Sequence, residues 1–150
     1  LTIKGKGEKN LSESENEMRR VIDTPVAQRE ITARLHVSLT PMPGVGTKVL
    51  ATVEIDRQGL AFDLFDGKPA ADVDIGGILY DDKGKPINSI VGRLRILQRS
   101  SNGSATQQKR SIYRFSTLVP GGLYQVRVGI RDLKSSRMGS AVDWITVPKI

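Results

Sequence analysis

The chain has 150 residues, of which 38% are hydrophobic and 26% are charged, a balance that suits one folded domain and argues against wholesale disorder. It contains no cysteine, which excludes disulfide frameworks, thiolate zinc sites and cysteine nucleophiles. The formal net charge of +7 favours anionic partners. Aromatic residues make up only 5% of the chain, however, which is a low content for a protein that binds single-stranded nucleic acid by stacking its bases on aromatic rings. We therefore predict no nucleic-acid partner.

Residues 1–25 are predicted to form a linker tail followed by one short helix that docks on the next domain. The apolar residues Met18, Val21 and Ile22 recur at helical spacing and give one narrow apolar face. Pro25 ends this helix, because proline disfavours helical geometry in the residue before it. A helix this short is not stable alone, so its apolar face should pack on the rest of the chain.

The remaining residues, 26–150, are predicted to form one β-sandwich domain. There the hydrophobic period changes to two, which is typical of half-buried strands. Seven strands are predicted, over residues 31–39, 48–56, 73–80, 87–97, 111–118, 123–132 and 139–147. No crossover helix lies between them, so the fold class is all-β: an immunoglobulin- or fibronectin III-like antiparallel sandwich of seven or eight strands.

The most specific local signal begins at Pro120-Gly121-Gly122 and continues into Tyr124. This spacing resembles the tyrosine corner of immunoglobulin-like and fibronectin type III domains, in which a buried tyrosine hydroxyl bonds a backbone group near the turn before its strand. The predicted core members are Leu35, Val37, Val53, Ile55, Ile78, Tyr80, Phe115, Tyr124, Val126, Val128, Ile130 and Trp144.

A series of short sequence motifs extends over about two thirds of the chain. It includes Val53-Glu54-Ile55-Asp56, Asp66-Gly67-Lys68, Ile78-Leu79-Tyr80-Asp81-Asp82-Lys83-Gly84-Lys85, Pro120-Gly121-Gly122-Leu123-Tyr124, Ile130-Arg131-Asp132 and Gly139-Ser140-Ala141. Together they resemble the C-terminal region of bacterial proteins related to von Willebrand factor A domains, frequent in Acidobacteria. The resemblance implies an A domain upstream, which would carry the Asp-x-Ser-x-Ser metal motif that this chain lacks.

The resemblance also implies an extracytoplasmic location, either secreted, periplasmic or in the cell envelope. Because the first residue is Leu1 rather than Met, we expect a fragment or a processed form. No apolar run approaches the about 20 residues of a membrane-spanning helix, so no membrane span is predicted.

The sequence offers no catalytic constellation, and we predict that the domain is not an enzyme and holds no cofactor. His36 is the only histidine, and the strand alternation places it opposite the apolar face, exposed and without a nearby nucleophile. The run from Gly44 to Lys48 has the wrong spacing for a phosphate loop and precedes a strand, so it is predicted to be a hairpin turn.

Six aspartates lie close together in the sequence between residues 63 and 82. They are Asp63, Asp66, Asp72, Asp74, Asp81 and Asp82. A calcium site needs about six to eight oxygen ligands converging from loops. Aspartate also favours turns through hydrogen bonds to its own backbone, and on this second interpretation we predict no metal site.

Five arginines are candidates for a surface that binds an anionic partner. Arg93 and Arg95 lie on the fourth predicted strand, Arg114 on the fifth, and Arg127 and Arg131 on the sixth. Alternate residues of one strand share a face, so the outer face carries a basic stripe if these strands are neighbours. Edge protection and solubility are the ordinary explanation for such charges, and an acidic glycan or an adjacent domain is the functional one.

The leading prediction is a non-catalytic accessory, interaction or spacer module of a secreted or envelope-associated protein related to von Willebrand factor A. Its partner would be another protein or the adjacent A domain in the same chain. The alternative is a sandwich that binds carbohydrate or another anionic ligand. A glycan binder should expose aromatic side chains on one sheet or loop rim, whereas most of the one Trp, three Tyr and three Phe are expected inside.

Overall fold

The computed structural model describes residues 22, 29–98 and 110–149, and in these residues nearly every element is a strand. The predicted linker tail and short helix of residues 1–25 lie outside the described residues apart from Ile22. The elements in chain order are β1 (Ala33–Met42), β2 (Gly46–Asp56), the 3-10 helix η1 (Arg57–Gly59), β3 (Asp63–Phe65), β4 (Lys68–Tyr80), β5 (Pro86–Leu97), β6 (Arg110–Val119), β7 (Gly122–Asp132) and β8 (Met138–Val147).

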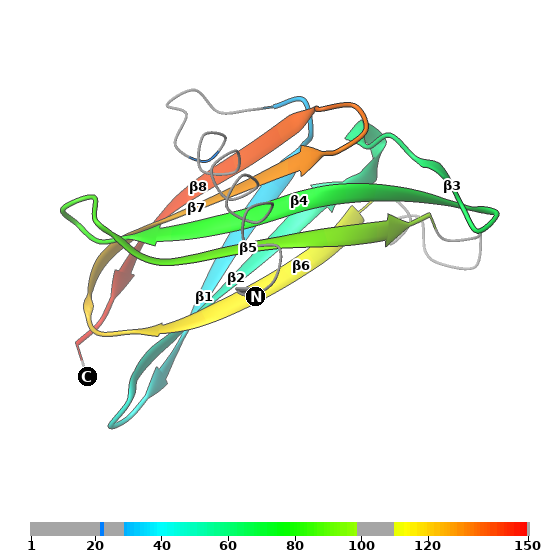
Figure 1. Cartoon of the computed structure of the whole chain (residues 1–150). Coiled ribbons are helices and arrows are strands. Elements are labelled where there is room, and N and C mark those ends of the chain that lie inside the picture. The colour runs from blue at the N-terminus through cyan, green and yellow to red at the C-terminus, as the bar shows by residue number, and fades with distance from the viewer. Residues whose placement is uncertain (1–21, 23–28, 99–109, 150) are drawn as a thin grey trace, which may run out of the picture.

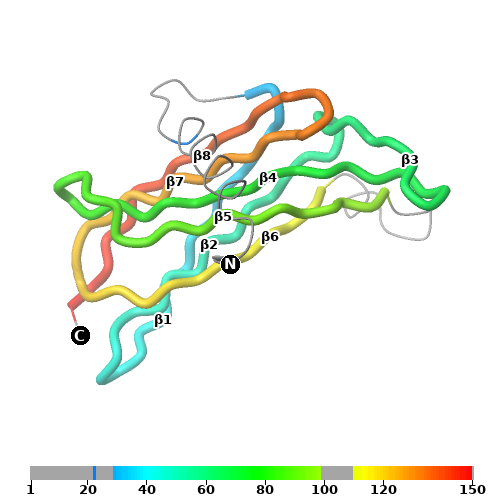
Figure 2. Tube along the Cα trace, viewed as in Figure 1, coloured from blue at the N-terminus to red at the C-terminus, as the bar shows by residue number. Residues whose placement is uncertain are grey.

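The strands form two antiparallel sheets that pack on each other as a sandwich (Figure 1). The smaller sheet has the order β1-β2-β6. In the larger sheet β4 is central: β5 pairs along one of its edges, whereas β3 and then β7 pair along the other, and β8 lies beyond β7. Figure 2 shows β4 continuing into β5, and β7 into β8, through short turns. The predicted antiparallel sandwich is confirmed.

The core lies between the two sheets because each strand turns alternate residues inward. In β2 these residues are Val49, Ala51, Val53 and Ile55, and in β7 they are Tyr124, Val126, Val128 and Ile130. The partly buried predicted members Leu35, Val37 and Phe115 pack against the same cluster.

The prediction of a core position is wrong for Trp144, whereas Ile78 and Tyr80 belong to a second, smaller cluster on the outer face of β4. Trp144 pairs with Gln125 on the outer face, and its side chain is 56% exposed, while Ile145 points inward. Ile78 and Tyr80 also face outward from β4. Ile78 is buried nonetheless, because Ile22 covers it outside the sandwich.

Two polar contacts fix the ends of the sandwich. The Tyr124 hydroxyl donates to the Pro120 carbonyl oxygen over 2.8 Å, which confirms the predicted tyrosine corner. The Asp132 carboxylate, fully buried where β7 ends, accepts hydrogen bonds from Ala61 N, Lys134 N and Ser135 Oγ. It thereby ties the turn between β7 and β8 to the segment before β3, a short strand that the sequence pattern missed.

Candidate functional site

The five candidate arginines do not share one surface. Arg93 and Arg95 of β5 point to the outer face of the five-stranded sheet, as do Arg127 and Arg131 of β7 on the other side of β4. Arg114 lies on β6, in the three-stranded sheet, so it points to the opposite side of the sandwich. The prediction of a single stripe is therefore wrong for Arg114, because β6 crosses to the other sheet.

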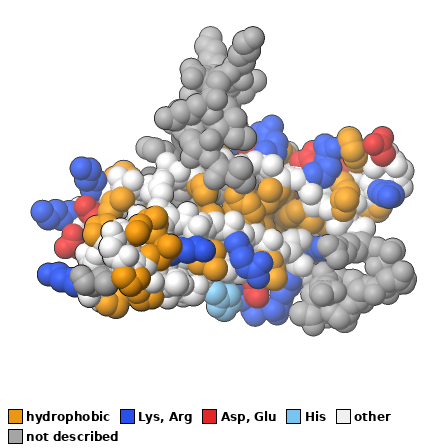
Figure 3. Space-filling view, turned by 90° about the horizontal axis from the view of Figure 1, so that it is seen from below, with side chains coloured by type: hydrophobic (Ala, Val, Ile, Leu, Met, Phe, Trp, Pro, Cys, Tyr) orange, Lys and Arg blue, Asp and Glu red, His pale blue; other side chains and the backbone are white. Residues whose placement is uncertain are grey.

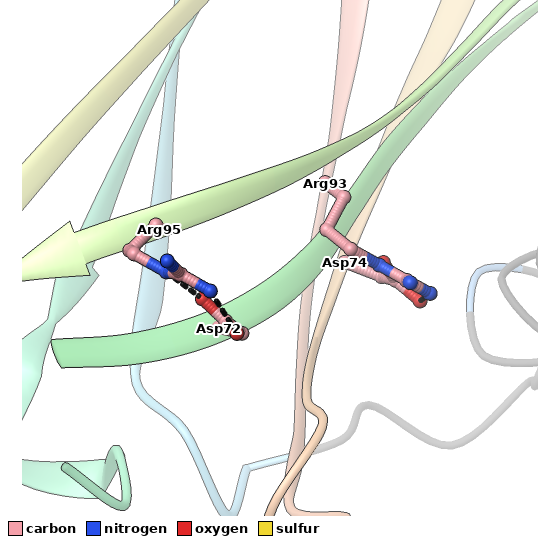
Figure 4. A network of polar contacts seen from close by, with 4 residues as sticks. All are labelled: Asp72, Asp74, Arg93 and Arg95. Atoms are coloured by element: carbon pink, nitrogen blue, oxygen red, sulfur yellow. Dashed lines mark hydrogen bonds and ion pairs between the residues drawn. The ribbon is translucent and has the colours of Figure 1, made fainter. Parts of the chain in front are cut away.

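The β5 arginines are held by carboxylates of β4, as Figure 4 shows. Arg95 donates from Nε to Asp72 Oδ1 over 2.8 Å and from Nη2 to Asp72 Oδ2 over 3.1 Å. Arg93 makes the same bidentate contact with Asp74, from Nε to Oδ1 over 2.8 Å and from Nη2 to Oδ2 over 3.3 Å. Such paired contacts are the strong form of the arginine–carboxylate interaction.

The two pairs differ in burial although their geometry is alike. The Asp74 side chain is 4% exposed, whereas that of Asp72 is 42% exposed. The hydrogen bond from Arg95 lowers the pKa of Asp72 below its usual value of 3.8. The Arg95 guanidinium also lies 3.5 Å from the centre of the Phe65 ring. Both arginines thus have ion-pair partners within the chain.

Arg127 and Arg131 lie in the same face but in different surroundings. Arg127 donates from Nε to Gln125 Oε1 over 2.9 Å, and its guanidinium lies 5.4 Å from the centre of the Tyr80 ring. Arg131 is directly opposite Asp74 in the β4–β7 register. The face therefore alternates acidic, basic and aromatic side chains and is not a uniform basic stripe.

An exposed apolar patch occupies the outer face of β7 and β8. Leu123, Val142 and Trp144, called the Trp144 patch below, are 44%, 50% and 56% exposed. The register places Gln125 beside Trp144 and Arg127 beside Val142, so all three apolar side chains emerge from one side of the sheet. The sequence alone could not show that Trp144 faces outward. In the last strand, apolar residues occupy both alternating sets of positions, with Trp144 in one set and Ile145 and Val147 in the other, so the pattern does not show which set faces the core.

A groove of about 680 Å³ opens between the edge strands β5 and β6. Its apolar lining includes Leu94, Ile96 and Tyr113, and the Tyr113 hydroxyl is buried with no hydrogen-bond partner. Further along these strands, Asn88 Nδ2 donates to Thr117 Oγ1 over 2.6 Å, so the two sheets are linked there and part toward the groove.

The remaining candidates behave as structural residues. His36 is exposed, as predicted, with its Nε2 3.9 Å from Glu54 Oε2. The β1–β2 turn comprises residues 43–45, where Val45 N donates to Met42 O over 2.9 Å, and Gly46, Thr47 and Lys48 already belong to β2. Asp81 accepts from Lys83 N and Lys85 N in the β4–β5 turn, which confirms its predicted turn role.

No metal-binding cluster is found where the structure describes the chain: within 22, 29–98 and 110–149, no three His, Cys, Asp or Glu side chains gather in a way that could hold an ion. Asp72 and Asp74 bond arginines instead, and Asp63 accepts a hydrogen bond from Lys134. None of the described residues belongs to a helix with the length and hydropathy that a bilayer crossing requires.

No protein-family model matches the sequence, and no curated protein matches it. Among solved structures, the chain is similar to a β-glucuronidase from Bacteroides uniformis, with a TM-score of 0.54 and 10% identity, over 75% of this chain and 13% of that one. It is also similar to a glycosyl hydrolase family 2 member from Bacteroides cellulosilyticus, with a TM-score of 0.50 and 9% identity, over 75% of this chain and 14% of that one.

A third similar structure is a putative β-galactosidase from Bacteroides fragilis, with a TM-score of 0.50 and 15% identity, over 75% of this chain and 16% of that one. The chain therefore spans only 13% to 16% of the length of these proteins. At such identities the likeness concerns the fold: the class of protein defined here is a small antiparallel β-sandwich domain.

Proposed function

We propose that this domain is a non-catalytic accessory module that docks on a folded protein domain through the Trp144 patch. The observation that carries the proposal is the exposure of Trp144 together with Leu123 and Val142 on one flat sheet face. Tryptophan is enriched among the residues that dominate the binding energy of protein interfaces, where apolar side chains surround it and exclude water.

The surroundings of Trp144 favour a protein over a glycan as the occupant. On this face the exposed neighbours of Trp144 are the aliphatic Leu123 and Val142 and one hydroxyl-bearing residue, Thr146. The Gln125 side chain beside the ring already accepts a hydrogen bond from Arg127. A glycan platform would need free polar groups around the ring to bond sugar hydroxyls. Carbohydrate binding at Trp144 is therefore the alternative that the experiment must separate.

Two observations support the proposal that the module is part of a larger protein. In the similar Bacteroides structures, the matched part is a small share of a much longer chain, which is how an accessory domain is used. The resemblance to the C-terminal region of proteins related to von Willebrand factor A supplies the first partner to test, an A domain in the same polypeptide. The proposed extracytoplasmic location rests on that resemblance alone.

Hydroxyl-radical footprinting read by mass spectrometry tests the proposal at the level of single residues. We expect strong oxidation of Trp144 in the 150-residue chain and several-fold protection of the same peptide in the intact protein from its source cells. The exposed Val45 in the β1–β2 turn and Leu64 of β3 serve as internal controls outside the Trp144 patch. Equal oxidation of Trp144 in the two samples would contradict the proposal.

A second arm of the same experiment addresses the alternative. Neutral oligosaccharides, such as cello- and xylo-oligosaccharides, are added to the 150-residue chain before oxidation. Protection of Trp144 by a sugar, lost in Trp144→Ala, would replace protein docking by carbohydrate binding. No protection by sugars, combined with protection in the intact protein, supports docking on a protein domain.

A further inference from the structure

The outer face of the three-stranded sheet is basic, and it lies on the opposite side of the sandwich from the Trp144 patch. Its cationic side chains are all exposed and come from all three strands: Arg34, Lys48, Arg110 and Arg114, with His36 among them. They are called the β1–β2–β6 basic face below. In Figure 3 the histidine lies at the lower margin of the view, beside basic side chains and an acidic one.

The strand register explains why these side chains emerge together. Directly opposed residues of antiparallel strands share a face. Thr52 of β2 is opposite His36 on one side and Arg114 on the other, so these two side chains flank it. Neighbouring strands lie about 4.8 Å apart, which sets the backbones of His36 and Arg114 about 10 Å apart across the sheet.

Only two carboxylates lie on this face among the described residues, and both are occupied within the chain. Glu54 Oε2 lies 3.5 Å from Arg110 Nη1 and 3.9 Å from His36 Nε2. Asp56 Oδ1 accepts from Gln58 N over 2.9 Å and caps η1. The four cationic side chains therefore outnumber the two carboxylates, and the excess charge favours an anionic ligand.

A small hollow is built into the face where two of its arginines meet. Its volume is about 30 Å³, and it is lined by Thr32, Arg34, Glu54, Asp56 and Arg110. A hollow of this size admits one water-sized polar group. An anionic oxygen placed there would lie between two guanidinium groups but also beside the Glu54 and Asp56 carboxylates, so the excess of positive charge belongs to the rest of the face, at Lys48 and Arg114.

The other side chains of the face indicate what kind of polyanion fits. Its remaining outward positions include the hydroxyl-bearing residues Ser38, Thr40, Thr52 and Ser116 and the apolar residues Leu50, Ile112 and Leu118. Within its described residues the face has no Phe, Tyr or Trp, so it lacks the rings on which unpaired bases stack. Hydroxyl groups between cationic side chains match a polymer that carries both hydroxyls and anionic groups.

We infer that the β1–β2–β6 basic face binds an acidic polysaccharide. Arg34, Arg110 and Arg114 would bond its carboxylate or sulfate groups, and the serine and threonine hydroxyls would bond its ring hydroxyls. This inference is independent of the proposed function, because it uses the opposite face of the sandwich and none of the Trp144 patch.

The test compares two charge-reversal variants with the same change in net charge. Arg34→Glu/Arg114→Glu alters the basic face, while Lys83→Glu/Lys85→Glu alters the exposed β4–β5 turn. Binding to polygalacturonate and to heparin is measured by calorimetry at low and at moderate salt, because phosphate-, sulfate- and carboxylate-rich polymers bind in a salt-dependent way. We expect the face variant to bind at least about tenfold more weakly and the turn variant to bind within about twofold of the parent chain.

The outcomes that overturn the inference are distinct. Equal weakening in both variants would mean that net charge alone attracts the polymer, and no weakening in the face variant would place the site elsewhere. Tighter binding of a thymidine oligonucleotide than of either polysaccharide would replace the ligand by nucleic acid. Should Arg34→Glu/Arg114→Glu melt at a much lower temperature, the neutral pair Arg34→Gln/Arg114→Gln repeats the measurement in a folded chain. Preference for polygalacturonate over heparin, or the reverse, then separates carboxylate from sulfate recognition.

Discussion

The Tyr124 hydroxyl donates a hydrogen bond to the Pro120 carbonyl oxygen over 2.8 Å, across the turn that leads from β6 into β7. β6 belongs to the three-stranded sheet and β7 to the five-stranded sheet, so this bond braces the point where the chain changes sheets. Tyr113 provides a contrast, since its hydroxyl is buried and has no hydrogen-bond partner.

Tyr124→Phe should destabilise the domain, because it removes a satisfied buried hydrogen bond and leaves the Pro120 carbonyl oxygen without this donor. We expect a loss of about 1–2 kcal/mol in the free energy of unfolding. Urea denaturation at pH 7 measures it as a lower midpoint at unchanged slope. An unchanged midpoint would show that the tyrosine corner has no energetic role in this sandwich.

Tyr113→Phe should not destabilise the domain as Tyr124→Phe does, because it removes a buried hydroxyl that makes no hydrogen bond. We expect the free energy of unfolding to stay unchanged or to rise by up to about 1 kcal/mol. The same urea experiment measures it, and Tyr124→Phe is the matched control that loses the same atom. A loss as large as that of Tyr124→Phe would mean that the Tyr113 hydroxyl has a partner in solution.

The two tyrosines also predict how stability falls in alkali. Burial raises the pKa of Tyr113 and of Tyr124 above the usual value of 10.0, with Asp81 and Asp82 adding to the effect at Tyr124. The folded state then keeps protons that the unfolded state has lost, so this contribution is complete below pH 10 and disappears as pH rises through the higher folded pKa. Urea midpoints above pH 10 should decline less steeply in Tyr113→Phe than in the parent chain, whereas parallel declines would contradict this assignment.

Much of the fold can be predicted from the sequence because period-two alternation is a local property. All seven predicted strands exist, and the largest boundary error is the start of β4, which begins at Lys68 instead of Val73. β3 was missed because three residues, Asp63–Phe65, are too few to show a period. The tyrosine corner was found because Pro-Gly-Gly followed by Tyr124 is a local signature with a geometric cause.

The surfaces could not be predicted as well, since they depend on which strands are neighbours. Arg114 was grouped with the other arginines because nothing near it in sequence shows that β6 joins the three-stranded sheet. The Asp72–Arg95 and Asp74–Arg93 pairs did have a usable signal. If β4 and β5 are paired as a hairpin about the turn that follows Tyr80, each aspartate falls within one position of its arginine partner. The remaining offset of one position is caused by the bulge between Leu79 and Tyr80.

Gly77 is required where it stands because the Phe115 ring lies against its backbone. A Cβ atom at this position would lie 2.5 Å from Phe115 Cζ, closer than packed atoms can approach. Gly77→Ala should therefore cost about 1–3 kcal/mol through overpacking, measured by thermal or urea unfolding. Phe115→Leu, added to Gly77→Ala, should recover most of that loss.

Gly92→Ala is the control for this prediction. Gly92 also lies in a strand of the five-stranded sheet, but the nearest atom to its added Cβ is the Tyr113 hydroxyl at 3.8 Å, an ordinary contact. Alanine should be neutral there or stabilise by up to about 1 kcal/mol, because it restricts the unfolded chain. If Gly77→Ala and Gly92→Ala have equal effects, the contact with Phe115 is not the cause.

The two arginine–aspartate pairs should differ in energy because they differ in burial. Arg93→Met leaves the buried Asp74 carboxylate without its Arg93 hydrogen bonds, and we expect it to cost about 1–3 kcal/mol. Arg95→Met breaks an exposed pair and should cost at most about 1 kcal/mol. Urea denaturation at pH 7 compares them directly, and equal losses would mean that burial does not decide their strength.

Acid separates the Arg95 contribution from a packing effect. The hydrogen bond from Arg95 lowers the pKa of Asp72 below 3.8, so the folded state releases this proton more readily than the unfolded state. The stabilisation is therefore complete above pH 3.8 and is lost as pH falls through the lowered folded pKa. The difference in urea midpoint between Arg95→Met and the parent chain should shrink toward zero as the pH is lowered from 7 into this range. If the difference in urea midpoint persists at low pH, it would come from the contact between the Arg95 guanidinium and the Phe65 ring. That contact does not depend on pH in this range, because arginine stays protonated and the ring does not titrate.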